Sequence, residues 1–190
     1  MSLPPGLPEP TLALSIPDEG VTDGTICLRL PTEADLDGIL PAFADPETRE
    51  AGNLPNFGRE DLLASLAFLP ELAASGRLLP LVAVEIESGE IVGGGTLHHL
   101  DAERAIAEIG YWVLPHARGR GVAKRIARLV ADHAFSLGVQ RVEARVNLDN
   151  PASERVLERV GFSREGVMRS LPKLDGHRID MTLYSLLPGE

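Results

Sequence analysis

Residues 115–125 combine glycines with basic side chains in a way that could bind an anion. Gly119 and Gly121 lie between an apolar segment and a segment with helical spacing. The first turn of a helix carries unpaired N–H groups and a partial positive charge, and glycines let an anion approach the backbone closely. Five of the 18 basic residues cluster here, namely Arg118, Arg120, Lys124, Arg125 and Arg128. This pattern predicts a polyanionic ligand, although a glycine-rich turn before a solvated basic helix face would have the same composition.

Two common nucleotide-binding motifs do not fit this segment. The chain contains no G-x-x-x-x-G-K-[ST] sequence, which a P-loop requires. Position 124 is lysine, so Gly119 and Gly121 lack the third glycine of the dinucleotide fingerprint. The sequence therefore indicates a different kind of phosphate site.

A carboxylate and a histidine pair are candidates for proton transfer or metal binding. Glu108 interrupts the apolar run 105–109, where it either faces solvent or lies in a cleft as a general base. His98 and His99 could coordinate a metal, but no second cluster of ligands follows them, so we expect no metal site.

The elements that must position these residues follow from hydrophobic periodicity. Strands are predicted at residues 25–30, 79–87, 91–99, 105–114, 141–146, 162–169 and 178–186, and a short one at 11–16. Helices are predicted at 32–43, 60–75, 121–137 and 151–160, with Pro70 breaking the second. Residues 44–58 read as a loop. This order predicts an α+β fold with a mixed sheet of six to seven strands.

Composition describes one globular domain with an acidic surface. The 190 residues are 44% hydrophobic and carry a net charge of −10, which disfavours nucleic acid and favours a basic partner. The single cysteine excludes an intramolecular disulfide. Residues 1–24, rich in Pro and Gly, are predicted to form an N-terminal arm before one domain at 25–190. We expect no signal peptide and no membrane partner, and hence a cytoplasmic protein.

Two blocks of residues resemble a known enzyme family. Residues 118–123, with the sequence Arg-Gly-Arg-Gly-Val-Ala, look like the Q/R-x-x-G-x-G/A signature of the GNAT acetyltransferases. Residues 141–162 are similar to the R-V-E-A-x-V…N-x-x-S-x-x-V-L-E-K-x-G-F run of the Rim-type branch, which acetylates N-terminal alanine or serine of ribosomal proteins. Residues 109–112, Ile-Gly-Tyr-Trp, resemble the same branch. The resemblance covers residues 25–187.

The resemblance implies a three-layer fold, splayed at a central parallel strand pair, and an N-acetyltransferase that uses acetyl-CoA. It implies Glu108 as the base and Ser153 as the acid that protonates the leaving thiolate. A backbone N–H near Val113 would stabilise the charge on the carbonyl oxygen. The coenzyme would contact Val113, Leu114, His116, Arg118, Gly119, Arg120, Gly121, Val122, Ala123, Asn150 and Ser153.

Two departures from the family pattern bear on the acceptor and the mechanism. Many members donate a proton from a tyrosine at the position of Leu157, which has no proton to donate. Rim-type enzymes often carry an acid shortly after the strand at 162–169, where only Asp175 is nearby. The acceptor is thus a peptide N-terminus or a small amine, such as an aminoglycoside or polyamine. A non-catalytic domain that binds coenzyme A is a further alternative, and a homodimer stays open.

Overall fold

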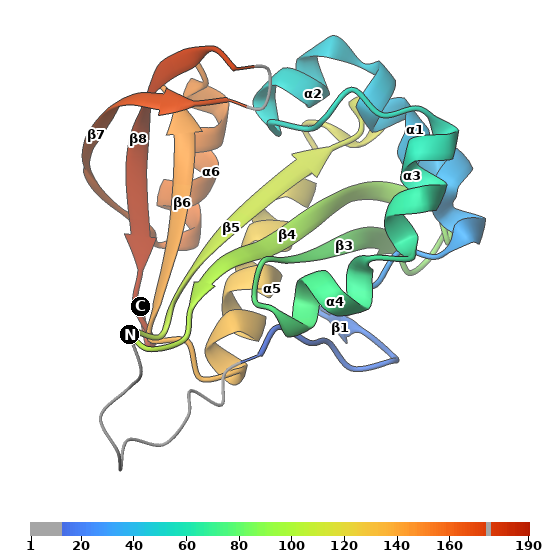
Figure 1. Cartoon of the computed structure of the whole chain (residues 1–190), viewed down its shortest axis with the longest axis horizontal. Helices are drawn as coiled ribbons and strands as arrows, with labels where there is room; N and C mark the ends of the chain where they lie inside the picture. The colour runs from blue at the N-terminus through green and yellow to red at the C-terminus, as the bar shows by residue number, and fades with distance from the viewer. Residues whose placement is uncertain (1–12, 174–175) are drawn as a thin grey trace.

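The computed structural model describes residues 13–173 and 176–190. Within these residues the centre is an eight-stranded sheet with the order β1-β2-β3-β4-β5-β6-β8-β7 (Figure 1). The strands are β1 (Val21–Thr22), β2 (Ile26–Arg29), β3 (Leu78–Glu85), β4 (Ile91–Asp101), β5 (Ile106–Val113), β6 (Arg141–Asn147), β7 (Ser163–Pro172) and β8 (Arg178–Leu186). Only β5 and β6 are parallel. The predicted mixed, mostly antiparallel sheet is confirmed. It has one strand more than the six to seven predicted, and the additional strand is the two-residue β1.

The parallel strands β5 and β6 separate after a short paired segment. They pair at three positions, from Ile106 opposite Arg141 to Glu108 opposite Glu143. Beyond Glu108, β5 stays on β4 while β6 stays on β8, and the two strands diverge toward their carboxyl ends (Figure 1). We call this divergence the splay. It leaves one backbone edge of residues 109–113 without a neighbouring strand.

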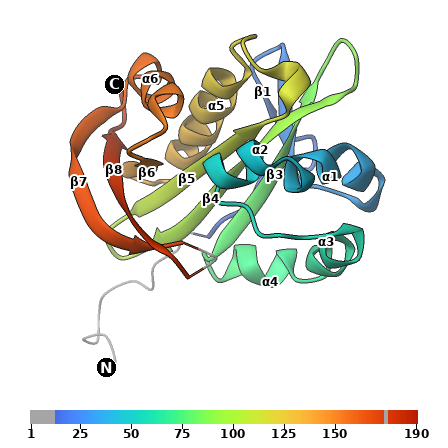
Figure 2. The same ribbon diagram turned by 90° about the horizontal axis from the view of Figure 1, so that it is seen from above.

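Helices cover both faces of the sheet (Figure 2). One face carries α1 (Leu36–Ala44), α2 (Pro46–Ala51), α3 (Arg59–Leu66) and α4 (Leu69–Ala74), and the other carries α5 (Val122–Ser136) and α6 (Pro151–Val160). Successive residues of a strand face opposite sides of a sheet, so β5 serves two cores. Ala107 and Ile109 pack with Ile126 of α5, whereas Trp112 packs with Leu36 of α1. The helix layers thereby fix the direction of every side chain on β5.

The segment after α1 differs from the prediction. Residues 44–58, expected to be a loop, contain the short helix α2. Asp45 caps it by accepting the N–H of Thr48 at 2.9 Å, and Pro46 occupies the first turn, where its missing N–H costs nothing. The helix predicted at 60–75 is indeed split, with Pro70 in the first turn of α4.

The N-terminal segment is partly structured. The strand predicted at 11–16 is not formed by residues 13–16, although Leu14 is buried in the main core. Val21–Thr22 of the predicted arm pairs with β2 as β1. Residues 1–12 and Asp175 lie outside the described part of the chain. Among the described residues, no helix combines the length and the apolar character that crossing a membrane requires.

Candidate active site

The glycine-rich segment forms an open turn at the start of α5. A short 3-10 helix, Pro115–Ala117, follows β5, and α5 begins at Val122. Gly119 and Gly121 have φ of 74° and 79°, a left-handed region that side chains with a Cβ rarely adopt. A Cβ built on either glycine would meet no heavy atom within 4 Å. The two glycines are therefore required by backbone conformation, and they leave the loop surface open.

The backbone amides of this loop are available to a ligand. Arg125 is the first residue of α5 whose N–H bonds back to the loop, at 3.3 Å from the carbonyl oxygen of Gly121. Within the described chain, the N–H groups of residues 119–124 donate to no backbone or side-chain acceptor. Residues 118–121 are exposed, whereas Val122 is buried and Ala123 is half-buried. The arrangement has the free amides that an anion at a helix N-terminus needs.

The cations around the loop are mostly paired with carboxylates. Arg118 donates to Asp45, Glu47 and Thr48 of α2 and its cap, at 2.7, 2.6 and 2.8 Å. Arg120 pairs with Glu85. Their guanidinium groups thus hold the loop in place, and the predicted contacts of Arg118 and Arg120 with the coenzyme stay predictions.

A basic cavity adjoins this loop on the outer side of α5. It has a volume of about 410 Å³ and is lined by Asp23, Arg120, Gly121, Lys124, Arg125, Arg128, Leu129 and Asp132. Arg125 pairs with Asp23 at 2.5 Å and Arg128 with Asp132 at 2.9 Å. Lys124 has no ion-pair partner among residues 13–173 and 176–190. It is the cation most free to meet a phosphate here. His116 is exposed at the turn before the loop.

The splay exposes a row of backbone groups on β5. Leu114 donates its N–H to Val92 of β4 at 3.1 Å. Because the direction alternates along an antiparallel ladder, Ile109, Tyr111 and Val113 point their N–H and C=O groups toward the side that β6 has left. Val113 therefore presents its N–H to the splay, as the oxyanion role requires. Leu114 is buried and donates its N–H to β4, so of these two neighbouring residues only Val113 has a free backbone donor.

A tyrosine that the sequence reasoning did not assign a role bridges the splay to α6. The hydroxyls of Tyr111 and Ser153 lie 2.6 Å apart, and the Tyr111 hydroxyl also donates to the Ser153 carbonyl at 3.2 Å. Asn150 caps α6 by accepting the Ser153 N–H at 3.0 Å, as predicted. Burial raises the pKa of Tyr111 to about 12. The phenol therefore stays protonated and can donate to Ser153. Leu157 is fully buried.

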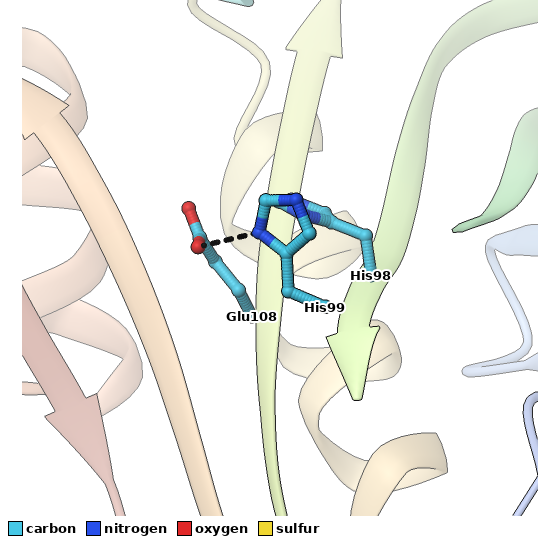
Figure 3. A group of neighbouring side chains, drawn as sticks. All are labelled: His98, His99 and Glu108. Carbon is cyan, nitrogen blue, oxygen red and sulfur yellow. Dashed lines mark hydrogen bonds and ion pairs between the residues drawn. The ribbon is translucent and has the colours of Figure 1, made fainter. Parts of the chain in front are cut away.

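Glu108 lies at the closed end of the splay in a polar cluster (Figure 3). Its side chain is 12% exposed, and its carboxylate lies 3.4 Å from Nδ1 of His99 and 3.3 Å from a guanidinium nitrogen of Arg145. Burial raises the pKa of Glu108, and the positive charge of Arg145 and the contact with His99 oppose that rise. A half-buried carboxylate with a raised pKa is suited to accept a proton.

His98 stands directly opposite Glu108 in the β4–β5 ladder, whereas His99 reaches Glu108 because β4 is irregular after His98. The β4–β5 register shifts between His98 and Asp101, and His99 has a φ of 52°. The shift places the two rings in edge contact, with centroids 4.6 Å apart (Figure 3). Burial, together with the charges of His99 and Arg145, lowers the pKa of His98 to about 4, so His98 is neutral at pH 7.

The positions of His98, His99 and Glu108 bear on whether the histidine pair could bind a metal ion. One ligand atom each of His98, His99 and Glu108 lies within 4.8 Å of the others. The sequence shows no second cluster of ligands after the histidine pair, but the fold brings Glu108 beside the two rings as a third possible ligand. The guanidinium of Arg145 contacts the carboxylate oxygen that faces His99, and its positive charge opposes a cation at that oxygen.

A second cavity lies near the carboxyl end of β6. Its volume is about 330 Å³, and it is lined by Glu50, Asn147, Leu148, Asp149, Ile179 and Asp180. These residues come from α2, from the end of β6 and from the start of β8. Asn147 shares a face of β6 with Glu143, and Glu143 is the residue that pairs with Glu108 of β5. The cavity therefore lies on the α2 side of the sheet, and Asn147 is two residues beyond Arg145 of the Glu108 cluster on the same face of β6.

Comparison with known proteins agrees with this geometry. A protein-family description, the acetyltransferase (GNAT) domain, matches residues 25–163. The uncharacterized N-acetyltransferase p20 of Bacillus licheniformis is 29% identical over 150 residues, which cover 78% of this chain and 84% of that protein. The ribosomal-protein-serine acetyltransferase of Escherichia coli K12 is 29% identical over 97 residues, or 50% of this chain and 54% of that protein.

A solved structure extends the similarity over most of the fold. Mycobacterium smegmatis RimJ in complex with CoA-disulfide aligns with a TM-score of 0.75 at 25% identity, covering 90% of this chain and 84% of that one. The family description spans most of the residues that build the sheet, the glycine loop and α6. This chain therefore belongs to the GNAT family of acetyltransferases and is an N-acetyltransferase.

Proposed function

We propose that this enzyme transfers the acetyl group of acetyl-CoA to the N-terminal amine of a protein or peptide, in the manner of the ribosomal-protein alanine and serine acetyltransferases. One observation supports the chemistry above all. Glu108 and the Tyr111–Ser153 pair flank the splay from opposite faces of β5, since residues 108 and 111 differ in parity along the strand. A base on one side and an acid on the other suit an amine attacking a thioester.

The donor side follows from the free backbone groups. The amides of residues 119–124 and the ammonium of Lys124 would hold the diphosphate, and the exposed edge of residues 109–113 would pair with the pantetheine arm. The bound coenzyme supplies an acetyl group already activated as a thioester. The N–H of Val113 would stabilise negative charge on the carbonyl oxygen, which oxyanion donors do in related chemistry.

The acceptor amine must lose a proton before it attacks. An α-amino group has a pKa of about 7.7–8.0, so at pH 7 most of it is an ammonium. Glu108, whose pKa burial raises, would take that proton directly or through water. The amine can also arrive neutral at higher pH, and the need for Glu108 then falls.

The leaving thiolate would take the proton of the Ser153 hydroxyl while the Tyr111 hydroxyl passes its own proton to Ser153, and the Tyr111 oxygen would regain a proton from water. We expect Ser153→Ala to lower kcat about 100-fold, the lower end of general-acid effects, with the KM for acetyl-CoA changed less than threefold, on the order of 0.6 kcal/mol. Tyr111→Phe should lower kcat by a smaller factor. Thiol release from acetyl-CoA measures both. Tyr184→Phe, at the other buried tyrosine, is the control, and equal losses in Tyr111→Phe and Tyr184→Phe would argue against the relay.

The proposal is tested by acceptor choice. Purified enzyme and acetyl-CoA are offered a panel of peptides that begin with Ala, Ser, Met or Pro, each also prepared with a blocked N-terminus, and a panel of polyamines and aminoglycosides. We expect thiol release with free Ala and Ser peptides and none with their blocked forms. Turnover of the small amines alone would replace the peptide assignment.

A small-amine acceptor is the second candidate, and one feature favours it. The cavity beside Asn147 has about the volume of a small ligand and three carboxylates at its wall, which suits a compact polycation. The non-peptide arm of the panel decides between the two.

A further inference from the structure

An arginine beside the splay has hydrogen-bond donors that no protein group accepts. The Nε atom of Arg145 is, among the described residues, the one buried side-chain nitrogen or oxygen atom without a hydrogen-bond partner. The guanidinium contacts Glu108 as an ion pair, with 3.3 Å between a terminal nitrogen and the carboxylate oxygen. It donates no hydrogen bond to any group in residues 13–173 and 176–190. All five of its N–H donors therefore lie beside the candidate base without a protein acceptor.

Two other arginines of similar exposure are satisfied by the fold. Arg141, on the same face of β6 and 26% exposed, donates to two carboxylates at 2.8 and 3.0 Å. Arg29, 33% exposed, donates to both oxygens of Asp35 at 2.7 Å. Arg145 is 31% exposed and has no such acceptor. Because a buried donor without an acceptor is unfavourable, Arg145 indicates an acceptor atom that a ligand supplies.

The strand register shows where that acceptor atom would lie. Glu143 is the last residue of β6 that pairs with β5, and Arg145 is the next residue on the same face. Continued pairing would place Arg145 opposite Gly110, which lies two residues beyond Glu108 on β5 and has no side chain. The guanidinium therefore lies where the splay begins, next to a position that leaves room for a ligand.

The distance between Glu108 and Arg145 restricts the chemistry of this ligand. A carboxylate able to accept a proton and a guanidinium 3.3 Å away form an acceptor and a donor side by side. In an α-amino acyl group, the nitrogen and the carbonyl oxygen are about 3 Å apart, since two carbon atoms join them. The amine can thus bind Glu108 while the carbonyl oxygen accepts from Arg145. A polyamine has no oxygen, and the guanidinium repels its other ammonium groups.

We propose that Arg145 determines acceptor specificity by donating a hydrogen bond to the carbonyl oxygen of the acceptor's first residue, whose amine lies at Glu108. The proposal rests on the peptide assignment above and adds to it the recognition of the α-amino carbonyl unit. The acceptor class is therefore the α-amino acyl compounds, of which a peptide is one. Amines without a neighbouring carbonyl are poor acceptors, because they leave the guanidinium without a hydrogen bond.

The test combines a change in the peptide with a change in the enzyme. The full chain is offered the peptide Ala-Gly-Ser-Gly and an analogue whose first peptide bond is a trans-alkene, which lacks the carbonyl oxygen. Thiol release from saturating acetyl-CoA is measured at pH 8.5. We expect Arg145→Met to lower kcat/KM at least 10-fold for the normal peptide, the usual effect of a hydrogen bond to a charged group. For the alkene analogue, the variant should lose less than threefold.

A second variant separates hydrogen bonding from charge. Arg145→Lys keeps a positive charge but lacks the planar guanidinium. It should keep the acidic limb of the wild-type pH–rate profile and still lose at least threefold of the preference for the normal peptide. Arg145→Met removes a charge that lowers the pKa of Glu108, so its acidic limb should move to higher pH.

Arg164→Met is the matched control, because it removes an exposed arginine from the other face of the sheet. Arg164 and Ala144 both pair with Tyr184, and Ala144 faces away from its neighbour Arg145. The control should keep the wild-type preference between the two peptides.

The outcomes distinguish this proposal from the peptide assignment. Thermal melting establishes that Arg145→Met is folded, and Arg145→Lys provides the same comparison if it is not. Equal losses for the two peptides would overturn the carbonyl contact and leave Arg145 as an electrostatic neighbour of Glu108, with peptide acetylation intact. If the wild type acetylates polyamines and neither peptide, the peptide assignment itself is overturned, and this proposal with it.

Discussion

Replacing Gly121 with glutamate should abolish coenzyme A binding. Gly121 caps α5 with a φ of 79° and opens onto free space, beside the amides proposed to hold the diphosphate. A carboxylate about 5 Å from one phosphate charge costs roughly 3 kcal/mol at an effective dielectric constant of about 20. The Kd for coenzyme A should therefore rise about 100-fold or more, measured by calorimetry.

A control at a second glycine separates charge at the loop from backbone strain. Gly89, in the turn between β3 and β4, has a φ of 72° and equally open surroundings. Gly89→Glu therefore imposes the same conformational cost at another site and should leave the Kd unchanged. Tight binding by Gly121→Glu, with normal thermal stability, would contradict the assignment of the anion loop.

Removing the ionisable group of Glu108 should give the second large effect. We expect Glu108→Gln to lower kcat at pH 6.5 by about 100-fold or more, within the usual range for general bases. The loss should shrink above pH 8, where an α-amine is already neutral. In the wild type, activity falls as pH drops through the raised pKa of Glu108, because only the ionised carboxylate accepts a proton. The variant should lack this fall in rate that Glu108 causes, and its rate should depend only on the fraction of the amine that is neutral.

Glu143→Gln is the matched control for this experiment. Glu143 stands opposite Glu108 on β6, but its carboxylate is paired with Arg141 at 2.8 Å. Because its negative charge helps to raise the pKa of Glu108, Glu143→Gln should keep the acidic limb of the wild type but move it to lower pH. Identical pH–rate profiles for Glu108→Gln and the wild type would remove Glu108 from the role of base.

Local sequence patterns predicted most of the framework but not its side-chain contacts. Nearest neighbours and periodicity determine the sequential order of the strands, the helix after Gly121 and the Asn150 cap. The structure contains all three. The predicted loop at 44–58 contains the helix α2, because Asp45 before a proline is a helix-start signal as well as a sign of a turn. The strand β1 has two residues, too few for any period to be seen.

The active-site contacts depend on tertiary structure that one sequence does not reveal. Tyr111 and Ser153 are 42 residues apart and meet only because β5 and β6 separate. The approach of His99 to Glu108 requires a left-handed residue at an irregularity of β4, and histidine gives no signal for that conformation. The ion pairs of Arg118 with α2 and its cap likewise could not be predicted from the sequence, because a basic residue near glycines suggests a phosphate ligand before it suggests a structural ion pair.

The attachment of α2 has a consequence for how this enzyme can change. Arg118 grips α2 near its start, and Lys173 holds it near its end through Glu50. Both connections are made by side chains, and α2 forms no part of the sheet. Substitutions at Asp45, Glu47 or Thr48 would therefore release Arg118 and loosen the glycine loop, although they change none of the strands that carry Glu108 and Val113. One arginine thereby links α2 to the loop proposed to hold the coenzyme, so evolutionary variation in this helix alters both.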